Sequence, residues 1–190
     1  MPSVEEGSAV RRYEEPRAHA LRARYLAAFG GPEIPVPVEA IAEDLLGLRI
    51  ERRWMEHSGM LQPAERTIVV NAAEWGRDVP PLRRYRFTIA HELGHWVCHV
   101  LGAGAERAEP VYCRAKDLSE DADRALEREA NVFAAELLMP EPAVRSVWEE
   151  LVAQSHELDP VTACAARFDV SPTAMQWRLH SFGLAGAPAG

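Results

Sequence analysis

Apolar residues recur along this chain with two different spacings, and the spacings separate helical segments from extended ones. Positions three and four apart mark one face of a helix, whereas alternating positions or short β-branched runs mark a strand. The helical spacing, with prolines at helix starts and glycines past helix ends, predicts helices at 17–29, 38–46, 81–101, 121–139, 160–168 and 172–182, and a further helix that Pro142 opens.

Two extended segments lie between the second and third predicted helices. The first, "LRIERRW" (Leu48–Trp54), has the pattern of a strand. The second, "SGMLQPAERTIVVN" (Ser58–Asn71), predicts a hairpin that turns near Pro63 and Ala64. A short strand at "PVYC" (110–113) is a further candidate. The pattern therefore predicts an α+β fold, with a small, mostly antiparallel sheet of about three strands packed on helices.

The composition fits a globular protein of the cytoplasm. The chain has 190 residues, 47% of them hydrophobic, which is enough for one compact core. It has no apolar run of about 18 residues and no apolar segment behind a basic start, so neither a membrane span nor a secretory signal is expected. Cys98, Cys113 and Cys164 have no metal-binding spacing and favour free thiols. The polar segment 1–16 is predicted to be disordered, and the tail 185–190 to fray.

The stretch "FTIAHELGHWVCH" (Phe87–His99) places two histidines one helical turn apart. His91 and His95 share a helix face, so both imidazoles can reach one ion at about 2.0–2.1 Å. Glu92 lies at the flank of that face, where it can hold a water beside the ion. The alternative is a helix that carries two histidines by chance. Because apolar residues surround the motif and place it beside a core, the pattern favours a metal site of the zinc-peptidase type.

His99 lies eight residues beyond His91 and is not expected to bind the same ion. On a continuous helix the two residues are about 12 Å apart along the axis, a span that no single ion bridges. Peptidases that use a third histidine from just downstream have a glycine turn before it, and "HWVCH" contains no glycine. His99 is therefore predicted to support a ligand or to pack in the core.

The third ligand is expected from "LEREANVFAAELLMP" (126–140), which offers two glutamates. Glu127 and Glu129 point about 200° apart on a helix, so only one of them can face the metal. Glu127 is favoured, because Asn131 follows it on the same face and can hydrogen-bond the second nitrogen of a ligand histidine. Ala130 and Ala134 flank this face and allow two helices to approach closely. The alternative for both glutamates is a solvated charge.

Taken together, "RFTIAHELGHWVCH" and "EREANVFAAELLMP" resemble the ImmA/IrrE family of metallopeptidases. "TIVVNAAE" upstream and "RFDVSPTAMQWRLHSFGL" downstream extend the likeness over roughly 17–184. The resemblance implies a zincin-like metallopeptidase core at 17–140, followed by a C-terminal helical, helix-turn-helix-like segment at 141–184. Some members carry a further sensor-like domain, which is not expected here because the chain ends at Gly190.

The same resemblance implies a metal-dependent endopeptidase that cleaves a helix-turn-helix repressor at one site and thereby derepresses stress or mobile-element genes. On the matched motifs, His91, His95 and Glu127 are the metal ligands, and Glu92 is the catalytic base. Zinc is the expected ion, and histidine and carboxylate ligands also suit manganese or iron. Tyr112 and His99 are candidates for a second oxyanion donor.

The charge of the chain indicates which kind of partner it binds. A net charge of −8 argues against direct nucleic-acid binding, and the last predicted helix pair holds few basic residues, Arg167, Arg178 and His180. This pair is predicted to be a lid on the core, with DNA binding or repressor docking as alternatives.

An extended substrate is expected to add to a sheet edge, and "TIVVN" is either that edge or an internal strand. Two rival functions stay open, a protein that sequesters a repressor without cutting it and a DNA-binding regulator.

Overall fold

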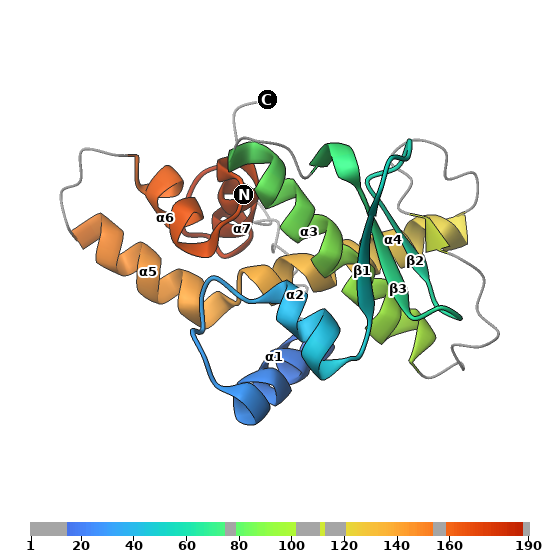
Figure 1. Ribbon diagram of the computed structural model, residues 1–190. Helices are drawn as coiled ribbons and strands as arrows, with labels where there is room; N and C mark the ends of the chain where they lie inside the picture. Colours follow the sequence, from blue (N-terminus) through green and yellow to red (C-terminus); the bar gives the residue numbers. More distant parts are fainter. Residues whose placement is uncertain (1–14, 75–78, 102–110, 113–120, 154–158, 188–190) are drawn as a thin grey trace, which may run out of the picture.

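The computed structural model places a four-stranded sheet beside a set of helices, which confirms the predicted α+β class (Figure 1). It describes residues 15–74, 79–101, 111–112, 121–153 and 159–187. In chain order the elements are α1 (Pro16–Phe29), α2 (Val38–Ala40), the π-helical turn η1 (Ile41–Leu45), β1 (Arg49–Arg53), β2 (Gly59–Gln62), β3 (Thr67–Asn71), the 3₁₀ turn η2 (Ala72–Glu74), α3 (Val79–His95), the π-helical turn η3 (Trp96–Val100), β4 (Val111–Tyr112), α4 (Asp121–Leu138), α5 (Glu141–Ala153), α6 (Pro160–Phe168) and α7 (Pro172–Ser181).

The strands follow the order β1-β3-β2-β4, so β3 lies inside the sheet. Strand β3 pairs parallel to β1, with Ile68 opposite Ile50, and antiparallel to β2, with Ile68 opposite Leu61. Strands β2 and β4 are also antiparallel, which confirms the mostly antiparallel sheet. The option that "TIVVN" forms an edge is wrong, because β3 is paired on both sides and Thr67–Val70 are fully buried. The edges among the described strands are β1 and β4.

Helix α3 crosses the middle of the molecule, with the sheet to its right in Figure 1 and helices α5, α6 and α7 to its left. Apolar residues recur along it at helical spacing, and Tyr85, Ile89 and Leu93 are buried as a result. Helix α4 packs directly on α3 at Gly94, where an added Cβ atom would lie 3.0 Å from both the Cα and the carbonyl oxygen of Ala130. The predicted close approach at Ala130 is confirmed, and it brings the two motif helices within side-chain reach.

The motif helix does not keep the α-helical form to Leu101. Its last turn, η3, is π-helical, and the Leu101 N–H donates to the Trp96 carbonyl at 2.9 Å. In a π-helical turn the donor and acceptor lie five positions apart along the chain instead of four, and such turns are frequent at functional sites. His99 lies in this turn, directly after the two motif histidines.

Helix α1 begins one residue earlier than predicted, at Pro16. The Glu15 carboxylate accepts a hydrogen bond from the Arg17 N–H at 3.1 Å and so caps the helix. Glu15 is 6% exposed, which places the start of α1 within the fold rather than in the disordered segment predicted for 1–16. The prediction for 1–14 lies outside the described residues, as do Cys113 and the end of the tail at 188–190.

The C-terminal helices pack on the core partly through a buried ion pair. Asp159 and Ser171 cap α6 and α7, respectively. In α7, Arg178 is buried, pairs with Glu136 of α4 and donates from Nε to the Met139 carbonyl at 2.9 Å. One of the basic residues considered for DNA contact therefore holds α7 against α4. None of the helices in the described part of the chain has the length and the apolar character that crossing a bilayer requires.

Candidate metal centre

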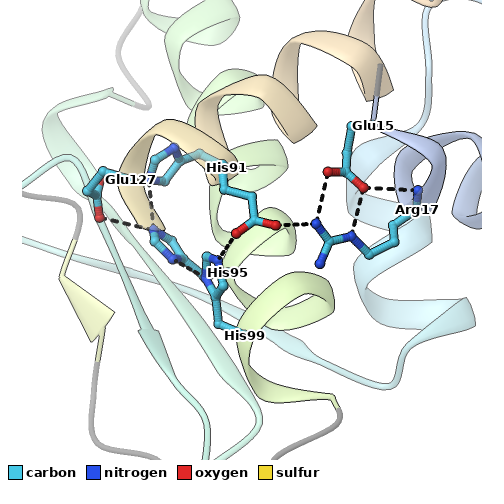
Figure 2. Close-up of polar contacts among 7 residues, drawn as sticks. Glu15, Arg17, His91, His95, His99 and Glu127 are labelled. Carbon is cyan, nitrogen blue, oxygen red and sulfur yellow. Dashed lines mark hydrogen bonds and ion pairs between the residues drawn. The ribbon is translucent and has the colours of Figure 1, made fainter. Parts of the chain in front are cut away.

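Helices α3 and α4 bring three side chains that can bind a metal close together (Figure 2). His91 and His95 come from α3 and Glu127 comes from α4, and one ligand atom of each lies within 4.8 Å of the others. The Nε2 atoms of the two histidines are 3.0 Å apart. Glu127 Oε2 lies 3.2 Å from His91 Nε2, and Glu127 Oε1 lies 3.1 Å from His95 Nε2. The structure thus brings together the three residues that the sequence predicted as ligands.

These separations fit a single tetrahedral ion. Ligand atoms held about 2.0–2.1 Å from zinc lie about 3.3 Å from one another. The two histidine Nε2 atoms, 3.0 Å apart, need only a small outward adjustment to reach that value, and each of them has a different oxygen of Glu127 within 3.2 Å. Among the described residues three ligands converge, and this number leaves a fourth tetrahedral position for water, as in catalytic zinc sites.

Asn131 of α4 orients the His91 ring. Its Oδ1 atom lies 3.1 Å from His91 Nδ1. Because an amide oxygen can only accept, His91 Nδ1 carries the proton, and His91 Nε2 presents a lone pair towards the other two candidate ligands. The hydrogen bond predicted from the spacing of Glu127 and Asn131 is therefore confirmed.

The charge states of the candidate ligands suit a cation. Burial alone would raise the pKa of Glu127, but its close contacts with the rings of His91 and His95 outweigh burial and lower this pKa to about 2. Burial lowers the pKa of His95, against the opposing effect of the neighbouring Glu127, and so favours the neutral ring. A carboxylate anion beside the neutral His95 ring suits a divalent ion.

Glu92 is a buried acid without a partner in the described part of the chain. Its side chain is fully buried, and neither carboxylate oxygen has a hydrogen-bond partner there. Burial, and then the negative charge of Glu127, raise the pKa of Glu92 well above its usual range. Such a group costs stability, so its place beside the three candidate ligands points to a chemical role.

Strand β2 presses on this acid from the sheet side. At Gly59, an added Cβ atom would lie 2.7 Å from Glu92 Oε1 and 2.5 Å from Thr88 Cγ2. Any residue larger than glycine at this position must therefore move the carboxyl group or the strand. Gly59 was not among the residues that sequence reasoning singled out, because its role depends on a contact between distant segments.

His99 and Glu129 lie behind the metal-type ligands. His99 Nδ1 is 3.1 Å from His95 Nδ1, and His99 Nε2 is 3.1 Å from Glu129 Oε2. His99 supports a candidate ligand, as predicted, and with both nitrogens engaged it cannot also serve as an oxyanion donor. The side chain of Tyr112, the other candidate donor, lies outside the described part of the structure.

Glu129 stays apart from the three candidate ligands, in line with the helix-face argument. The alternative prediction, that Glu129 is a solvated charge, is wrong, because Glu129 also accepts a hydrogen bond from Arg17 of α1. Sequence reasoning missed Arg17 and Glu15, which binds the same guanidinium. No local pattern could have revealed this contact, since Arg17 and Glu129 are 112 positions apart.

The family model of the IrrE N-terminal-like domain, Peptidase_M78, matches residues 56–180. The matched range includes both motif helices, strands β2 and β3, and nearly all of α7. His91, Glu92, His95 and Glu127 all fall inside it, whereas helix α1 and strand β1 precede it. No curated protein matches the chain.

Proposed function

The chain belongs to the IrrE N-terminal-like domain family of peptidases, and from this premise we propose that it is a metal-dependent endopeptidase. The observation that carries the proposal is the buried Glu92 carboxyl group, which has no hydrogen-bond partner among the described residues and is close enough to Glu127, one of the three convergent ligands, for the charge of Glu127 to raise its pKa. A module that only binds its partner has no use for a buried acid, because burying it without a partner costs stability.

In this proposal His91, His95 and Glu127 hold the ion. A zinc ion would supply Lewis acidity that polarises the peptide carbonyl and lowers the pKa of a water, and manganese or iron suits the same donors. Glu92 takes a proton from the attacking water as the C–O bond forms. It returns that proton to the amine nitrogen as the C–N bond breaks, so the acid ends in its starting state. A pKa raised by burial suits a group that must both accept and donate a proton.

The proposed substrate is a helix-turn-helix transcriptional repressor, whose cleavage would derepress stress or mobile-element genes. The resemblance of the two long motifs to ImmA/IrrE peptidases supports this class. An extended segment of the substrate would add to the β4 edge of the sheet. Strand β4 pairs with β2, which carries Gly59 beside Glu92, whereas β1 lies on the far side of β3.

The last two helices would cover the core or dock the repressor rather than bind DNA. Arg178 is buried against α4, and Arg167 pairs with Glu150 at 2.9 Å, so the positive charges of this segment are largely neutralised. With a net charge of −8, the chain lacks the cationic density that phosphate binding needs. We place the reaction in the cytoplasm, which suits the free thiols of Cys98 and Cys164.

The proposal is tested by incubating this protein with a helix-turn-helix repressor encoded next to its own gene. We expect one new terminus in the repressor by mass spectrometry, formed with metal and absent when a chelator is added. Relief of repression without fragments would favour the sequestering alternative. A specific, salt-sensitive mobility shift of operator DNA by this chain at about 0.15 M salt would favour a DNA-binding regulator.

Gly59→Ala is expected to reduce cleavage roughly tenfold or more while the metal stays bound, because the three atoms nearest to the added Cβ atom belong to Glu92 and Thr88 and none to a candidate ligand. Metal content per chain and kcat/KM measure the two effects separately. Gly186→Ala is the matched control, since a Cβ atom there meets nothing within 4 Å. If Gly59→Ala cleaves like the control, the acid has room to move and its placement by β2 is unimportant.

A further inference from the structure

A continuous series of hydrogen bonds joins His95 to the start of helix α1 (Figure 2). His95 Nδ1 lies 3.1 Å from His99 Nδ1, and His99 Nε2 lies 3.1 Å from Glu129 Oε2. The other oxygen of Glu129 accepts from Arg17 Nη2. Arg17 also donates to the Glu15 carboxylate, from Nε at 2.7 Å and from Nη2 at 2.9 Å. These five residues form what we name the His95 relay.

The direction of every hydrogen bond in the relay follows from Arg17, because a guanidinium can only donate. Glu129 therefore accepts on one oxygen from Arg17 and on the other from His99, whose Nε2 must carry a proton. In a neutral imidazole the second nitrogen then has no proton, so His99 Nδ1 accepts. His95 Nδ1 must be the donor, which leaves His95 Nε2 with a lone pair directed at Glu127 and His91.

The far end of the relay is firmly held. Glu15 is buried and accepts from both the backbone N–H and the guanidinium of Arg17, so the guanidinium is fixed from the start of α1. The hydrogen bond from Arg17, acting against partial burial, lowers the pKa of Glu129 and keeps it an anion. The guanidinium is thus shared between two carboxylates, with Glu129 turned towards His99.

We infer that Arg17 and Glu129 are positioning residues that act through His99 to hold the His95 ring in the tautomer and orientation that present Nε2 to the metal. The inference rests on the proposed metal site. Asn131 does the same for His91 in a single contact, whereas His95 depends on side chains from η3, α4 and α1. Residues that orient a ligand histidine typically change metal affinity about 10–100-fold when they are removed.

The competing explanation is that the Arg17–Glu129 ion pair merely tethers α1 to α4. A tether predicts a lower melting temperature of the metal-free protein and an unchanged affinity for metal. The relay predicts weaker metal binding even for a change at Arg17, whose side chain is 40% exposed and hydrogen-bonds to Glu15 and Glu129 rather than to a candidate ligand histidine.

The dissociation constant for Zn²⁺, measured on the full chain by competition with a chromophoric chelator, separates the two explanations. We expect it to rise about 10–100-fold in Glu129→Ala and about tenfold in Arg17→Ala, with Arg17→Lys close to wild type. Glu150→Ala is the matched control, because Glu150 forms an exposed ion pair with Arg167 between α5 and α6. Nitrogen-15 chemical shifts of the histidine rings in the metal-free protein give a second readout, in which His95 should lose its Nδ1–H tautomer in Glu129→Ala.

The outcomes also separate this inference from the proposed function. If wild type binds no Zn²⁺, the metal site itself fails. If wild type binds Zn²⁺ and both variants match the Glu150→Ala control in affinity and in His95 tautomer, the site stands and the relay is overturned. Should Glu129→Ala fail to fold, Arg17→Ala alone decides, since its change lies three hydrogen bonds away from His95.

Discussion

Replacing Glu92 by glutamine should slow repressor cleavage by about 10²–10⁴-fold without emptying the metal site. Glutamine keeps the size and shape of the side chain but cannot take a proton from water. The Glu92 oxygens have no hydrogen-bond partner in the described structure, so the change breaks no hydrogen bond that holds α3 in place. The rate of fragment formation, metal content per chain and affinity for the repressor are the three measurements, and only the first should change.

Glu92→Asp provides the matched comparison, because it keeps the acid but withdraws it by one methylene. We expect an activity between those of wild type and Glu92→Gln. Wild-type cleavage by Glu92→Gln would show that another group accepts the proton. Loss of metal from Glu92→Gln would show that Glu92 holds the ion instead of acting beside it.

The parts of the fold that depend on neighbours in sequence were predicted well. The helical spacing, the prolines at helix starts and the β-branched run placed most elements close to their observed bounds. Helix geometry also paired His91 with His95 and separated Glu127 from Glu129, because a side chain's direction on a helix depends only on its position along it. The spacing also predicted that Asn131 would hydrogen-bond one of the ligand histidines, and the structure identifies that histidine as His91.

The parts that depend on distant segments could not be predicted. Strand β3 was equally compatible with an edge and with the interior, since strand order is decided by packing across the whole sheet. The role of Gly59 exists only because β2 passes over Glu92. Glu129 looked like an ordinary surface charge, and only the fold reveals that α1 brings Arg17 to it.

Replacing Glu127 by alanine should empty the metal site, whereas replacing Glu129 by alanine should leave it filled when metal is in excess. Glu127 is the one anion among the three convergent ligands, and both of its oxygens lie within 3.2 Å of a histidine Nε2. Its removal leaves two neutral imidazoles, which lack both the third ligand and the negative charge that offsets a divalent ion. The affinity loss should therefore exceed the 10–100-fold expected of a residue that only supports a ligand.

The two variants form an internal control, because Glu127 and Glu129 are acids on the same helix and differ in what they contact. Metal content after dialysis against excess Zn²⁺ should be close to one ion per chain for wild type and Glu129→Ala, and close to zero for Glu127→Ala. Glu129→Ala should then lose its ion first as free Zn²⁺ is lowered, since its effect is on affinity through His99 and His95. An empty site in Glu129→Ala beside a filled one in Glu127→Ala would reverse the roles of the two acids. Glu129 and its neighbours in the relay would then be metal ligands themselves.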